Sequence, residues 1–150
     1  MPLPDLSSSI RVVGNIPPQL ISSATVTGGD HPEANKRYIY LRDVYDAYLI
    51  VDCGSVGAPI QVKLQHSTEA AGTYSDVTDA SDIITVGERF TQHIYKINCR
   101  GRSDGPYYRA SILVGGGGGG SFVGATLYAA WPKDNLLDGD LAMTSITANW

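Results

Sequence analysis

The chain has 150 residues, 43% of them hydrophobic, with a net charge of −4 and a sequence pI near 5.2. This length fits one domain with a core of reasonable size, and the apolar fraction excludes a disordered chain. The acidic balance argues against a nucleic-acid partner, because such partners favour a basic face. No apolar run approaches the roughly 18 residues of a membrane-spanning helix, and residues 1–5 lack the basic start of a signal peptide. We therefore expect that the protein is made in a cytoplasm and does not bind a membrane.

Residues 1–19 have the composition of an extended N-terminal arm. They contain four prolines, two of them adjacent at Pro17 and Pro18, which disfavour a regular packed element. Four apolar residues in this segment need a surface to lie on, namely Ile10, Val12, Val13 and Ile16. An edge strand folded onto its own domain and an arm docked on a neighbouring subunit explain them equally well. In the second case these four residues bind a partner.

Residues 20–132 contain short runs with the alternation of β-strands. Strands are predicted over 21–26, 44–53, 60–66, 83–86 and 92–99, with 67–82 as a polar excursion. Residues 30–37 suit one or two helical turns, and 38–41 suit a strand. In the run 60–66, Ile60, Val62 and Leu64 face one side and polar residues face the other. One buried face and one wet face are typical of an antiparallel sheet.

Two further strand-like runs, 107–114 and 121–131, flank six consecutive glycines, Gly115–Gly120. Both runs are rich in the β-branched and aromatic residues that strands favour. Hexaglycine has no side chains with which to offset its ordering entropy. The pattern predicts a long β-hairpin with a mobile loop at its tip.

About seven short strands with almost no helix indicate an all-β domain, an antiparallel β-sandwich or jelly-roll-like fold. Residues 133–150 follow it as a C-terminal arm without clear periodicity. The arm carries candidate partner-binding residues, namely Leu136, Leu137, Leu141, Met143, Ile146 and Trp150. Exposed apolar area of this kind marks contact with a partner, and covering the open end of its own sandwich is the alternative.

Catalytic and metal-binding patterns are missing from the sequence. His31, His66 and His93 have no ligand spacing, and Asp138–Asp140 lacks the later acceptors of a calcium loop. Cys53 and Cys99 form no CxxC pair, and two free thiols are favoured over a disulfide in a cytoplasm. Arg100, Arg102 and Arg109 cluster near one turn and could bind an acidic partner surface. A solvated turn with salt bridges at its rim is the favoured interpretation. We therefore expect that the protein is not an enzyme and that it binds no cofactor, metal or small-molecule ligand.

The segment from Ile60 to Trp131 resembles the head decoration, or cement, proteins of tailed bacteriophages. The resemblance lies in the strand Val62–Ser67, the motif Tyr74–Val77, the turn and strand Gly105–Ala110, and a glycine-rich hairpin with a return strand. It covers about half of the chain. It implies a β-sandwich body on the outer surface of a capsid, bound to the major capsid protein and bridging adjacent capsomers, as a homodimer or homotrimer.

The sequence therefore predicts a structural virion protein, and a tail-associated phage structural protein is a variant of this hypothesis. The alternative from another class is a carbohydrate-binding β-sandwich, with Tyr74, Tyr107 or Tyr128 as sugar platforms. The other tyrosines are better explained as sheet or interface residues, namely Tyr38, Tyr40, Tyr45 and Tyr48.

Overall fold

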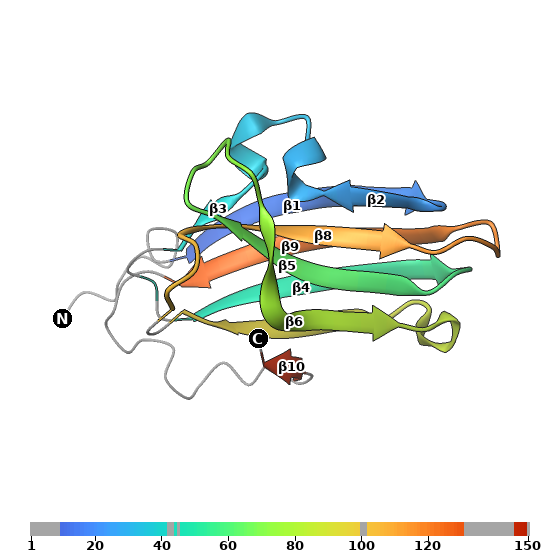
Figure 1. The fold of residues 1–150 in the computed structure, drawn as a ribbon. Helices are drawn as coiled ribbons and strands as arrows, with labels where there is room; N and C mark the ends of the chain where they lie inside the picture. Colours follow the sequence, from blue (N-terminus) through green and yellow to red (C-terminus); the bar gives the residue numbers. More distant parts are fainter. Residues whose placement is uncertain (1–9, 42–43, 45, 100–101, 131–145, 150) are drawn as a thin grey trace.

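The computed structural model describes residues 10–41, 44, 46–99, 102–130 and 146–149. Two β-sheets pack face to face, with no α-helix among the described residues (Figure 1). The strands are β1 (Ile10–Ile21), β2 (Ala24–Thr27), β3 (Ile39–Tyr40), β4 (Asp46–Val56), β5 (Ile60–Ser67), β6 (Ser75–Ile84), β7 (Gln92–Asn98), β8 (Tyr107–Val114), β9 (Ser121–Ala130) and β10 (Ile146–Asn149). Three short 3-10 turns lie between them, namely η1 (Gly28–Asp30), η2 (Ala34–Lys36) and η3 (Val86–Glu88). The predicted all-β sandwich is confirmed.

The strand order is that of a jelly roll. Sheet A runs β1-β9-β4-β7-β10, and sheet B runs β2-β8-β5-β6 with β3 paired to the edge of β8 that β2 also occupies. The chain passes repeatedly from one sheet to the other, so that both sheets are built from distant parts of the chain; β5 and β6 are successive strands that stay paired within sheet B (Figure 1). β10 adds to the edge of sheet A in parallel with β7.

The core lies between the sheets and consists mainly of alternating residues of the strands. Ile60, Val62 and Leu64 are fully buried, as their alternation predicted. The same holds for the inward faces of the other predicted strands, namely Ala47, Leu49, Val51, Tyr95, Ile97, Tyr108, Ala110, Ile112, Val114, Val123, Ala125, Leu127 and Ala129. Period-two alternation therefore identifies most core positions of these strands, although Ile94 and Ser111 are buried outside the alternation.

The second half of the predicted N-terminal arm is a strand of the sandwich. β1 pairs antiparallel with β9, with register shifts on both sides of Ile16, and the adjacent Pro17 and Pro18 lie near its end. An edge strand tolerates proline because one side of it needs no hydrogen-bond donors. Of the two alternatives for residues 10–19, the structure has the edge strand; residues 1–9 lie outside the described residues.

The predicted hairpin is wrong, because β8 belongs to sheet B and β9 to sheet A. The glycine segment crosses between the sheets, a gap of about 10 Å that six residues span easily. It is also held in place: Gly57 N–H donates to Gly120 O at 3.0 Å, and Gly115 N–H donates to Pro59 O at 3.2 Å. Gly118 has φ +63°, and a Cβ there would overlap the carbonyl oxygen of Gly57. Glycine is required at that point for close backbone approach.

The polar excursion predicted over 67–82 contains most of a strand, β6. Its buried residues Val77, Ala80 and Ile84 are spaced by three and four rather than two. Asp79 has φ +60°, and the pairing of β6 with β5 shifts register between Lys63 and Gln65. This irregularity interrupts the alternation and hides the strand from a period-two search. The predicted strand 83–86 is the end of β6 and the start of η3.

Candidate functional site

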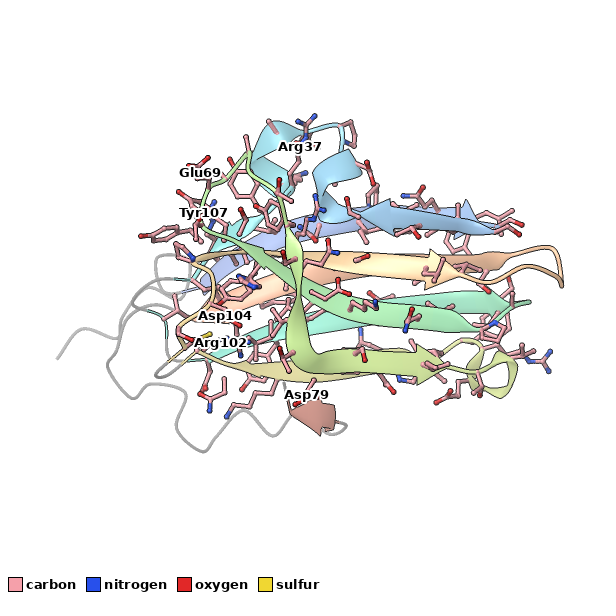
Figure 2. All side chains as sticks on the ribbon, viewed as in Figure 1. Arg37, Glu69, Asp79, Arg102, Asp104 and Tyr107 are labelled. Atoms are coloured by element: carbon pink, nitrogen blue, oxygen red, sulfur yellow. The ribbon has the colours of Figure 1, made fainter. Side chains whose placement is uncertain are left out.

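The outer face of sheet B carries four tyrosines and an arginine near the start of β8. We call Tyr38, Tyr40, Tyr74, Tyr107 and Arg109 the tyrosine–arginine cluster. Tyr107 packs edge-on against Tyr38 at 5.5 Å and against Tyr40 at 5.1 Å between ring centroids. Tyr107 and Arg109 face outward because they alternate with the buried Tyr108 and Ala110. Figure 2 labels Tyr107 at this end of the sandwich.

Arg109 lies half-buried at the centre of this face. Its Cζ stands 4.2 Å from the ring centroid of Tyr74, and its Nε donates to Gln65 Oε1 at 2.9 Å. On the other side lies Gly29, where a Cβ would come within 2.6 Å of Arg109 Nη1. Burial lowers the pKa of Arg109 below its ordinary value, so the charged form is under-compensated here.

Two local structures hold the cluster in place. Asn15, from β1 of the opposite sheet, is fully buried and accepts a hydrogen bond from Ala110 N–H, next to Arg109. Its amide nitrogen donates to Arg37 O at 2.8 Å, which fixes the segment just before Tyr38. Tyr74 donates to Ala70 O at 3.0 Å, and burial raises the pKa of Tyr74 to about 12. The segments that carry the cluster are thus held by the Asn15 side chain, which reaches across from the opposite sheet, and by the local hydrogen bond of Tyr74.

A second polar cluster closes the core between the sheets at the same end. Arg102 binds Asp104 through two hydrogen bonds, of 2.6 and 2.8 Å, and also donates to Asn98 O of sheet A. Tyr108 donates to Asp104 Oδ1 at 2.5 Å. Arg102 and Asp104 lie side by side in Figure 2. We call Arg102, Asp104 and Tyr108 the closing cluster.

The ionisation of the closing cluster is set by these contacts. Burial raises the pKa of Asp104, but hydrogen bonds from Arg102 and Tyr108 outweigh it and hold this pKa below its ordinary value. The hydrogen bond to Asp104 raises the pKa of Arg102. Burial, followed by the hydrogen bond to Asp104, raises the pKa of Tyr108. Each charge has its partner, so this cluster is structural.

The predicted partner-binding residues of the N-terminal segment are separated by the fold. Val13 and Ile16 are only 2% and 1% exposed in the core of their own domain, so the prediction that they bind a partner is wrong. Their side chains lie on the inner face of sheet A, which β1 joins as an edge strand. Val12 faces outward and is 54% exposed, so it remains available to a partner. Ile10 begins β1 opposite Ala130.

The predicted residues of the C-terminal arm fall mostly outside the described residues. These are Leu136, Leu137, Leu141, Met143 and Trp150. Ile146 begins β10 and pairs with Ile94 of β7. Residues 146–149 thus add a strand to the edge of their own domain.

The histidines and cysteines lie apart from the tyrosine–arginine cluster. His31 Nδ1 accepts from Glu33 N–H, His66 Nδ1 accepts from Gly105 N–H, and His93 Nε2 contacts Thr91 Oγ1. Among the described residues no group of three or more His, Cys, Asp or Glu side chains could hold a metal. Cys53 and Cys99 are free thiols, and burial raises the pKa of each to about 11.

Sequence reasoning found some members of the cluster but not their association. Tyr74 and Tyr107 come together, whereas Tyr128 lies on β9 in the other sheet. Arg102 and Arg109 are not one basic group, because Arg102 is bound by Asp104 and Arg109 lies on the outer face. The signal that identifies Arg109 is its spacing of two residues from Tyr107, which places both side chains on one face of a strand.

Comparison with known proteins adds little. No family model matches the chain, and no curated protein matches it. A solved structure described as "Crystal structure of PirA" aligns with 81% of this chain and 91% of its own chain, at 11% identity and a TM-score of 0.34. A score this low carries no argument. Within the part of the chain that the structure describes, no helix is long and apolar enough to cross a membrane.

Proposed function

We propose that this chain is a non-enzymatic structural protein of a phage particle, a capsid decoration protein that binds the major capsid protein and bridges adjacent capsomers. It would act as a homo-oligomer on the outer surface of a virion assembled in the host cytoplasm. The observation that carries the proposal is the tyrosine–arginine cluster on the outside of a filled jelly roll. Tyrosine and arginine are the residues that dominate the energetics of protein interfaces.

Two further observations support a binding role. The closing cluster satisfies its own charges, so its arginine and carboxylate are committed to the fold rather than to a substrate. The strands of the resemblance, from Val62 to Ala110, include those that carry Arg109, Tyr107 and Gln65. The segment of the resemblance therefore supplies Tyr74, Tyr107 and Arg109 of the cluster, whereas Tyr38 and Tyr40 lie outside it.

The test is binding to capsid shells. Expanded shells of the phage that encodes the chain, prepared without it, are mixed with the purified protein and pelleted. Saturable co-sedimentation at micromolar concentration, with increased resistance of the shells to heat, is the expected result. Unexpanded shells serve as a control for the capsid state. Failure to pellet with any shell would exclude the proposed function.

A carbohydrate-binding module is the second candidate, favoured by the grouping of Tyr38, Tyr40 and Tyr107. Sugars stack on exposed aromatic faces, but these rings meet edge to face, at interplanar angles of 88° and 65°. Such an arrangement offers a corner rather than a flat platform. Retention on a glycan array that is lost in Tyr107→Ala would support this second candidate over the first.

A further inference from the structure

We infer that Arg109 is the anchor of the docking face and that it binds a side-chain carboxylate, Asp or Glu, on a segment of the major capsid protein. The inference rests on the proposed function and names the contact that would carry it. Its starting point is that Arg109 is half-buried and has no ion pair within the described residues. Arg11, Arg37 and Arg89 also have none, but they are exposed to solvent.

Several cations near this face already have an anionic partner. Lys36 pairs with Glu33 at 2.9 Å, Lys63 pairs with Asp76 at 2.7 Å, and Arg102 pairs with Asp104 at 2.6 Å. No carboxylate of the described residues lies within ion-pair distance of Arg109. Asp30, its nearby acidic neighbour, accepts hydrogen bonds from the main chain and hydroxyl of Thr27 instead.

The hydrogen bonds of Arg109 are also incomplete. A guanidinium carries five N–H donors, and only the Nε–H of Arg109 has an acceptor among the described residues, the neutral Gln65. The two Nη groups, which form the fork that recognises a carboxylate, are left for another molecule. Burial has already removed part of the water around the charge. A carboxylate would therefore form charge-assisted bonds in a partly desolvated site, where such bonds are strongest.

The surroundings favour a protein segment over a free anion. Tyr74 covers one face of the guanidinium and holds its plane, which pre-organises the fork at no cost to the partner. Tyr107, with Tyr38 and Tyr40 around it, supplies adjoining aromatic surface on the same outer face. An acidic side chain with an apolar neighbour would use both features. Inorganic anions would use only the charge.

The experiment compares four proteins in co-sedimentation with expanded capsid shells. R109Q is expected to bind at least about 30-fold more weakly than wild type, because it removes the charge and the fork. R89Q makes the same charge change at an exposed arginine beside η3, at the opposite end of the sandwich, and is expected to bind as wild type does. R109K keeps the charge without the fork and is expected to bind with intermediate affinity.

R109K also identifies the partner group. A zero-length carbodiimide reagent joins an amine to a carboxylate that it contacts, so the amine of this variant should crosslink to one Asp or Glu of the capsid protein, found by mass spectrometry. If R109Q does not fold, the crosslink of R109K alone tests whether residue 109 contacts a carboxylate of the capsid protein. Absence of that crosslink in bound R109K overturns the inference.

The outcomes separate the two proposals. Wild type that does not bind shells excludes the proposed function itself. Wild type that binds, with R109Q equal to it, leaves the function standing and overturns the role of Arg109. If wild type is retained on acidic glycans, and R109Q loses this retention while its binding to shells is unchanged, the inference that Arg109 binds a capsid carboxylate is also overturned. Arg109 would then be assigned to binding of an acidic sugar.

Discussion

At one end of the sandwich, where β8 passes into β9, the sheets are joined by backbone packed on backbone, with Gly118 against Gly57. At the other end, where β8 begins, the sheets are joined by the closing cluster, and the tyrosine–arginine cluster lies outside it (Figures 1 and 2). We call these the glycine end and the tyrosine end. The contact between the two glycines at the first end is made by backbone atoms alone. At the second end the inner cluster has its charges paired, and Arg109 of the outer cluster has no carboxylate partner within the described residues. Under the proposed function, stability and recognition would therefore depend on different residues of the same end.

Neighbouring tyrosines give the sharpest test of this separation. Tyr108→Ala removes a buried ring and its hydrogen bond to Asp104, and should destabilise the fold by about 3–5 kcal/mol. Tyr107→Ala removes a half-exposed ring and should cost about 1 kcal/mol. Urea unfolding followed by circular dichroism measures both. Equal losses would show that the outer tyrosines support the fold as much as the inner one does.

The glycine end should depend on particular glycines rather than on glycine content. Gly118→Ala introduces a left-handed alanine whose Cβ overlaps Gly57 O, and should cost about 2–4 kcal/mol. Gly115→Ala is the control, since its Cβ would meet only Pro59 O at 3.9 Å and its φ is not positive. It should be neutral or slightly stabilising. Two neutral variants would mean that the loop is free to move, as the sequence predicts.

The fold was predictable where strands alternate regularly and unpredictable where distant segments meet. The buried face of the strand with Ile60, Val62 and Leu64 can be identified from its own sequence, because side chains alternate between the two faces of a strand. Pairing is different: the runs on either side of Gly115–Gly120 have the same composition whether they form a hairpin or cross between sheets. Only the total arrangement of the other strands decides between the two.

The candidate site shows the same limit. Arg102 and Arg109 look alike in the sequence, and their difference depends on Asp104 reaching Arg102 and on Asn15 entering from the opposite sheet. The outward direction of Arg109 could be read from its strand. The absence of a carboxylate partner among the described residues could not, because it depends on where Asp30, Asp76 and Asp104 lie in space.

The two arginines should differ in how much stability is lost when their charge is removed. R102Q leaves Asp104 partly buried without its cation, and should lower the free energy of unfolding by about 2 kcal/mol. R109Q loses its contact with Tyr74 and one neutral hydrogen bond, and should lower it by at most about 1 kcal/mol. Thermal and urea unfolding of both variants at neutral pH measure the difference. A larger loss in R109Q would identify Arg109 as a structural residue.

Acid provides the finest distinction between the inner and outer clusters. The pKa of Asp104 is lower in the folded protein than its ordinary value of 3.8, so its contribution to stability is complete above about pH 4 and is lost as the pH falls through the folded pKa. The stability difference between wild type and R102Q should therefore shrink as the pH falls from about 4 towards 2. Arg109 has no carboxylate within ion-pair distance among the described residues and feels only the more distant charge of Asp30, so the difference between wild type and R109Q should change much less over the same range. Urea midpoints at a series of pH values test both statements. A parallel loss in the two variants would mean that a carboxylate within the same chain neutralises Arg109, and its outer position would then serve the fold rather than a capsid.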